Sequence, residues 1–156
     1  MTTAFVDYAA DQVAREQIAN AVMKHTEMLC EALVQNYIKY CIRAHQRSLE
    51  STGDLRIDLG SVEYDYHQRK INQLKSGECD IAYEIETGRK YHKIIFIDGG
   101  GQRSVHAFVD KKTGEVYKPA TWKSPTKGVR FDLRIIEQRE WLLENADWAG
   151  GYLYAR

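Results

Sequence analysis

The sequence predicts an α+β fold, in which an N-terminal helical arm or hairpin packs with a small antiparallel β-meander and a C-terminal helix. Two observations support this prediction. Residues 3–49 contain neither Gly nor Pro and repeat apolar residues at helical spacing, whereas residues 80–118 alternate apolar and polar residues between glycine-containing turns. The predicted division is a helical segment over residues 1–50 and an α+β domain with the meander over 51–156. The pattern leaves open whether the sheet curls into a small barrel.

Composition narrows the class of protein. The chain has 156 residues, 44% of them hydrophobic, and a formal net charge of +0, so one domain can bury a core without disulfides. A neutral balance argues against coating nucleic acid through bulk charge, although it allows a local basic patch. The cysteines, Cys30, Cys41 and Cys79, form no C-x-x-C pair. The sequence has no leader-like N-terminus and no transmembrane-length apolar run, so we expect a cytoplasmic protein without cofactor, metal or membrane partner.

The first helix is too long for one small domain to cover. Its apolar face is marked by Ile18, Val22, Leu29, Leu33, Tyr37 and Tyr40. At 1.5 Å per residue the unbroken helix would be roughly 65–70 Å long. Either the chain bends into a hairpin near Asn20 or Asn36, or the helix packs against another subunit. We therefore expect a homo-oligomer formed through residues 4–48.

A second helix is predicted after a polar hinge over residues 48–54 that ends the first helix at Gly53. It begins after an N-cap at Ser61 and ends before a C′ glycine at Gly77. The alternative interprets residues 61–67 as a strand, because polar and apolar residues alternate there. A strand would place Glu63, Asp65 and His67 on one face as metal ligands; on the favoured helix Asp65 points away, so no metal site is predicted.

The meander is expected to consist of strands over residues 80–85, 91–97, 104–109 and 115–118. The turn from Asp110 to Gly114 is typical of a type I turn closed by a glycine bulge. A loop over 119–128, an extended stretch over 129–131 and a helix over 133–145 follow. His92 and His106 alternate with apolar residues, so we expect both on the polar side of the sheet, facing each other if their strands pair. Neither has a nucleophile elbow or a second carboxylate near it in sequence, and no catalytic residue is predicted.

The best candidate site lies between residues 111 and 134. Seven cations (Lys111, Lys112, Lys118, Lys123, Lys127, Arg130 and Arg134) outnumber two acids there, and Tyr117, Trp122 and Phe131 are interleaved with them. Binding of single-stranded nucleic acid combines cations that hold phosphates with aromatic faces that stack on bases. We expect Lys118, Lys123, Lys127 and Arg130 to contact phosphate and Trp122 to stack. Arg103, which follows a run of glycines, is a further phosphate ligand. In the alternative, Trp122 and Phe131 turn inward to close the core.

A family resemblance is carried by three runs: VHAFVDKKTGEVYKPATW over residues 105–122, KGVRFDL over 127–133 and ADWAGGYLY over 146–154. They resemble an uncharacterised short protein family of marine tailed phages. The resemblance covers the C-terminal part of the chain and leaves out the helical first half. It implies a phage accessory protein acting in the host-cell cytoplasm, with no activity, cofactor or catalytic residue attached.

The sequence thus predicts a non-enzymatic accessory protein that binds single-stranded nucleic acid or a nucleotide. The alternative is a structural or assembly component that acts through oligomerisation of the N-terminal helix.

Overall fold

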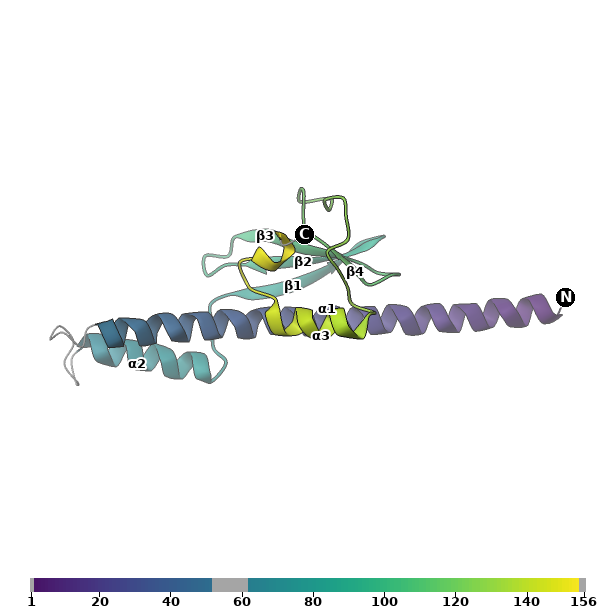
Figure 1. The fold of residues 1–156 in the computed structure, drawn as a ribbon. Coiled ribbons are helices and arrows are strands. Elements are labelled where there is room, and N and C mark those ends of the chain that lie inside the picture. Colours follow the sequence, from purple (N-terminus) through teal and green to yellow (C-terminus); the bar gives the residue numbers. More distant parts are fainter. Residues whose placement is uncertain (1, 52–61, 155–156) are drawn as a thin grey trace.

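The computed structural model describes residues 2–51 and 62–154 and confirms the α+β prediction. The helices are α1 (Thr2–Ser51), α2 (Val62–Lys75), α3 (Ile136–Asn145) and a 3₁₀ turn, η1 (Gly151–Tyr154). The strands are β1 (Ala82–Thr87), β2 (Tyr91–Ile97), β3 (Arg103–Asp110), β4 (Glu115–Tyr117) and β5 (Phe131–Asp132). Figure 1 shows α1 running along one face of the sheet and projecting past it at the N-terminal end. The predicted stop at Gly53 and the cap at Ser61 lie outside the described residues.

Helix α1 is a single helix of 50 residues, about 75 Å long. The chain does not bend at Asn20 or Asn36, so the hairpin alternative is wrong and the extended arm is the form observed. The absence of Gly and Pro from this stretch leaves no residue that would break the helix. Among the described residues, no helix has both the length and the apolar character needed to cross a membrane.

Helix α2 lies antiparallel beside the C-terminal end of α1 (Figure 1). Ile71 and Leu74 of α2 and Ile38 of α1 are buried, and the Nδ1 atoms of His45 and His67 lie 2.9 Å apart. The predicted helix is confirmed, and the alternative strand over residues 61–67 is wrong. Gly77 ends it with a φ of 95°, and the Gly77 and Glu78 amides donate to the carbonyls of Leu74 and Gln73. This is the glycine-closed helix end that the sequence predicts.

The five strands form an antiparallel meander in the order β1-β2-β3-β4-β5. The sheet is open, with β1 and β5 at its edges, so it does not close into a barrel. The register between β2 and β3 shifts once: Ile94 pairs with Ala107 and Ile95 pairs with Val105. His106 is therefore the extra residue of a β-bulge, which changes the direction of its side chain.

The core lies between α1 and the face of the sheet that α1 covers, here called the inner face. Val22, Leu29 and Leu33 of α1 are fully buried in one cluster with Ile94 and Val109 of the strands. The other buried members of that cluster are Ala107, Val116, Phe131, Leu133, Leu142, Ala146, Tyr152 and Leu153. Each fully buried aliphatic side chain contributes roughly 1.5–3 kcal/mol. The opposite face of the sheet is called the outer face.

His92 and His106 do not face each other on a polar side, and that expectation is wrong. Both are buried, with 6% and 8% of their surface exposed. His92 pairs with Val109 and hydrogen-bonds Thr87, whereas His106 Nε2 lies 2.7 Å from the Tyr152 hydroxyl. The two imidazoles are separated along the strands, because the partner of His92 is Val109, three residues from His106.

We predict that Gly114→Ala lowers the free energy of unfolding by about 1–3 kcal/mol. Gly114 has a φ of 78°, a region that costs other residues about 1–2 kcal/mol. An added Cβ would also lie 3.0 Å from Arg134 Cγ and 3.4 Å from Val22 Cγ2. Urea denaturation measures the change. In the matched control, Gly88→Ala, the added Cβ meets only the Tyr91 carbonyl oxygen at 3.6 Å, and equal losses at both glycines would contradict the prediction.

We predict that stability falls as the pH drops from about 6.5 towards 4, in part because of His106. Burial lowers the pKa of His106 from 6.5 to about 4, although Asp147 opposes the shift. In this window the unfolded chain binds the proton and the folded chain does not, so acid favours unfolding, by about 3 kcal/mol for this group. Denaturation at several pH values should show a shallower slope for His106→Gln, whose amide does not titrate. An unchanged slope would contradict the assignment.

Candidate functional site

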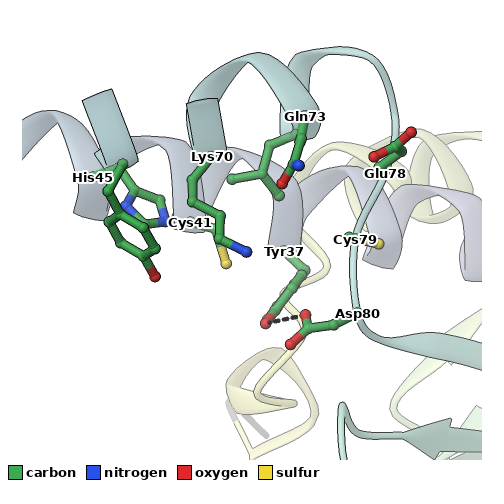
Figure 2. Close-up of a pocket in the computed structure, with 10 residues that line it drawn as sticks. Tyr37, Cys41, His45, Lys70, Gln73, Glu78, Cys79 and Asp80 are labelled. Carbon is green, nitrogen blue, oxygen red and sulfur yellow. Dashed lines mark hydrogen bonds between the residues drawn. The ribbon is translucent and has the colours of Figure 1, made fainter. Parts of the chain in front are cut away.

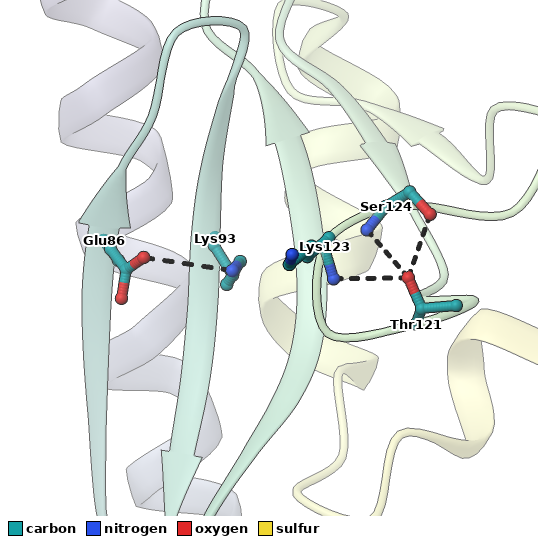
Figure 3. A network of polar contacts seen from close by, with 5 residues as sticks. All are labelled: Glu86, Lys93, Thr121, Lys123 and Ser124. Carbon is teal, nitrogen blue, oxygen red and sulfur yellow. Dashed lines mark hydrogen bonds and ion pairs between the residues drawn. The ribbon is translucent and has the colours of Figure 1, made fainter.

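The loop over residues 118–126 stands on the side of the sheet away from α1 (Figure 1) and is held by its own hydrogen bonds. The Thr126 amide and hydroxyl both donate to the Lys118 carbonyl, at 2.8 and 3.0 Å. The Thr121 hydroxyl oxygen accepts from the amides of Lys123 and Ser124, at 3.2 and 3.1 Å (Figure 3). Trp122 and Lys123 therefore sit at an ordered loop tip.

Trp122 is exposed over 43% of its surface and lies under a lysine from the sheet. The Lys93 ammonium is 4.7 Å from the centre of the Trp122 ring and 5.9 Å from that of Phe108, and 3.8 Å from the Glu86 carboxylate. Such cation–π contacts are attractive because the face of the ring is electron-rich. The inward alternative is thus wrong for Trp122 but right for Phe131, which is 5% exposed and belongs to the core.

Further aromatic residues extend this surface along the sheet. The Tyr91 ring lies 5.6 Å from Phe108 and 6.0 Å from Tyr117, and the Lys90 ammonium is 5.3 Å from the Tyr91 centroid. Together with Lys93 and Trp122 these residues alternate cations and rings. We call this set the outer-face track: Lys90, Tyr91, Lys93, Phe108, Tyr117 and Trp122.

Two turns bring four cations together at one end of the sheet, here called the basic end: Arg89, Lys90, Lys111 and Lys112. The turns are joined, because the Lys111 amide donates to the Lys90 carbonyl at 3.0 Å and its ammonium to the Gly88 carbonyl at 2.8 Å. Asp110, beside these cations, is buried and its Oδ1 accepts hydrogen bonds from the amides of Lys112 and Thr113. Burial lowers the pKa of His92, and the Lys111 ammonium lowers it further. Four cations outnumber Asp110, so these five residues carry a net positive charge.

The residues predicted from the sequence do not form one site. Trp122 and Lys123 share the loop tip, and Lys127 is exposed further along the chain. The Lys118 ammonium lies 4.3 Å from the Tyr154 ring, and Arg130 donates to the carbonyls of Leu153 and Gly128 at 2.8 and 3.2 Å. Arg103 bonds Glu84 at 2.9 Å, at the end of β3 farthest from the basic end.

The site predicted from the sequence did not include Arg89, Lys90, Tyr91 and Lys93, because the local excess of cations lies between residues 111 and 134. The signal was present in β2, where Tyr91 and Lys93 alternate with His92 and Ile94. Alternate residues of a strand point to opposite faces of the sheet. Tyr91 and Lys93 therefore share one face, and Ile94 lies on the other.

A cavity of about 410 Å³ lies between α1, α2 and residues 78–80 (Figure 2). The Tyr37 hydroxyl donates to Asp80 Oδ1 at 3.0 Å, and Lys70 and Gln73 of α2 also line the cavity. Burial raises the pKa of the Cys41 thiol, and burial together with bonding to Cys41 and Asp80 raises that of Tyr37. Both groups are therefore favoured in their protonated forms. In the described part of the chain, no group of three or more His, Cys, Asp and Glu residues is arranged to hold a metal ion.

A model of a family of unknown function, DUF7717, matches residues 5–155. The expectation of an uncharacterised family is confirmed, but its extent is corrected, because the match includes α1 and α2 as well as the C-terminal part. No curated protein and no solved structure matches the chain significantly. The chain therefore belongs to this family of unknown function, DUF7717.

Proposed function

We propose that this protein binds single-stranded nucleic acid across the outer face of its sheet. The observation that carries the proposal is the position of Trp122, exposed at an ordered loop tip and adjacent to a lysine of the sheet. An exposed indole can stack on a base of any identity, and stacking contributes about 1–3 kcal/mol per base. Because the loop is fixed by hydrogen bonds, little conformational entropy is lost when a base binds.

The outer-face track supports a strand that passes along the sheet from Trp122 to the basic end. Tyr91 and Tyr117 are partly exposed between these two points, so they offer further stacking surfaces. The cations beside the rings can neutralise phosphates at the same time. A duplex keeps its bases stacked inside and cannot use the rings in this way, which favours a single strand as the ligand.

The basic end supplies most of the phosphate contacts in this proposal. Arg89, Lys90 and Lys112 are exposed, and Asp110, the acid beside them, offsets only part of their positive charge. Lys123 extends the positive surface to the loop tip. Arg103, by contrast, is already paired with Glu84, and Arg130 is bonded to backbone carbonyls, so we assign both a structural role.

We predict that affinity for a labelled single-stranded oligonucleotide of about 15 nucleotides falls steeply with salt. If about four cations engage phosphates, log affinity should decrease against log salt with a slope near −3. Replacing Lys90 and Lys112 together by Gln should make the slope shallower by about 1.4. The control pair, Lys39→Gln with Lys75→Gln, removes two exposed charges from the helices and should leave the slope unchanged.

Trp122→Ala should weaken binding at least about fivefold, because one stacking contact of about 1–3 kcal/mol is lost. Trp141→Ala is the matched control: Trp141 is 46% exposed but stacks on Phe131 at 5.3 Å, away from the outer-face track. Fluorescence anisotropy measures both variants after circular dichroism has confirmed folding. No binding of the parent chain at low salt, or equal losses for the two tryptophans, would refute the proposal.

The phage origin and the cytoplasmic location implied by the resemblance remain predictions. The alternative function, assembly through the N-terminal helix, is favoured by one observation: Phe5, Val6 and Tyr8 of α1 are each more than half exposed, at 71%, 62% and 60%.

A further inference from the structure

The N-terminal part of α1, residues 4–19, is called the arm, and it projects past the sheet (Figure 1). One face of the arm continues the row of α1 residues that packs against the sheet, here called the stripe. Val22, Leu29 and Leu33 are buried there, and the same alternation of three- and four-residue steps runs back along the arm through Ala19, Arg15, Gln12, Tyr8 and Phe5. Residues at this spacing share one helix face. The face that forms the core is therefore left uncovered along the arm.

A cavity of about 560 Å³ lies at the base of the arm and is called the arm groove. Its floor consists of Ile18 and Ala19, and its rim carries three cations, Arg15, Lys111 and Lys112, and one acid, Glu16. The groove thus combines an apolar floor with a rim of net positive charge. A complementary occupant is an apolar segment that carries acids.

The arm itself has that composition. Phe5 and Tyr8 are 71% and 60% exposed, and the neighbouring Asp7 and Asp11 are exposed acids. It cannot fill the groove of its own molecule, because α1 is unbroken and Phe5 lies about 21 Å along the axis from Ala19. The occupant must come from another molecule.

We propose that two copies of this chain pair through their arms, side by side and antiparallel, with each arm filling the groove of the other copy. The sequence of the arm suits this symmetry. Phe5 and Ala19 are equally far from Gln12, as are Tyr8 and Glu16, so pairing around Gln12 places both rings of one copy over the groove of the other. The two copies are then related by a two-fold axis, and both grooves are filled through the same contact.

The charges favour the same register. With Gln12 at the axis, Arg15 of the partner lies opposite Ala9, about 3 Å along the helix from both Asp7 and Asp11. Lys111 and Lys112 of the partner border the groove that Phe5 and Tyr8 enter. A parallel pair would instead set Asp7 against Asp7 and Arg15 against Arg15, which like-charge repulsion disfavours.

The area available is enough for a reversible dimer. The four rings of two arms would bury on the order of 500 Å². That is about a third of a standard interface of roughly 1,600 Å², and the aliphatic residues and the groove rims add to it. We therefore expect dissociation in the micromolar range.

Sedimentation equilibrium of the full chain, from about 1 to 200 μM, tests the pairing. We expect a monomer–dimer equilibrium that Tyr8→Glu shifts to monomer over the whole range. Ala10→Glu is the control: it adds the same charge on the same exposed arm, but two residues further along, or 200° around the helix, and so away from the stripe. A parent chain that is monomeric at every concentration, or equal disruption by both variants, would overturn the proposal.

Charge exchange and cross-linking test the register. Asp11→Arg and Arg15→Asp should each weaken the dimer at least about fivefold, and the two together should restore it, because the attraction is re-formed with reversed signs. Gln12→Cys should form a disulfide-linked dimer under mild oxidation that the parent chain, with its three native cysteines, does not form. No restoration by the double variant, or cross-linking through Phe5→Cys, would overturn the antiparallel arrangement, because only a parallel pair brings the two Phe5 positions together.

Discussion

The structure depends on the packing of one stripe of α1 against the inner face of the sheet. Val22, Leu29 and Leu33 are completely buried, and the strands present Ile94, Ala107, Val109 and Val116 to them. Even the polar member of the stripe, Thr26, is accommodated, because its hydroxyl donates to the Val22 carbonyl at 2.7 Å. Since α1 covers the inner face, only the outer face and the ends of the sheet are open to a large ligand. Tyr91, Lys93 and Tyr117 lie on the outer face, whereas Tyr83 and Phe131 pack with the core.

The continuity of α1 links this packing to two other features of the molecule. A helix of 50 residues is much longer than the sheet it covers, so both of its ends need other neighbours. At the C-terminal end α2 supplies one, through Ile71 and Leu74 and the contact of His45 with His67. At the N-terminal end the described chain supplies no such neighbour, so the stripe is uncovered along the arm. The proposed dimer and the proposed nucleic-acid surface share Lys111 and Lys112, which border both the arm groove and the basic end, so we expect the two to influence each other.

Much of the fold could be predicted from local patterns, and the exceptions have physical causes. The strands, the helix end at Gly77 and the turn at Gly114 follow from residue types and their spacing. The sequence alone could not decide whether α1 bends. The spacing of apolar residues shows which face of the helix is buried, but not whether another part of the same chain or another subunit covers that face. The bulge at His106 depends on the register of β2 against β3, which no single strand encodes. The site was predicted in part: Trp122 and Lys123 lie together as expected. The bond of Arg130 to Leu153 and the contact of Lys93 with Trp122 could not be predicted, since both join distant segments of the chain.

The central claim is that the outer face, and not the cavity between α1 and α2, is the binding surface. Chemical-shift mapping of the ¹⁵N-labelled full chain with a single-stranded oligonucleotide tests this most directly. We expect shifts of the Trp122 indole N–H and of the amides of residues 89–93 and 111–112, with the amides around Tyr37, Cys41 and Asp80 unchanged. Shifts confined to those cavity residues, or no shifts at saturating oligonucleotide, would contradict the claim.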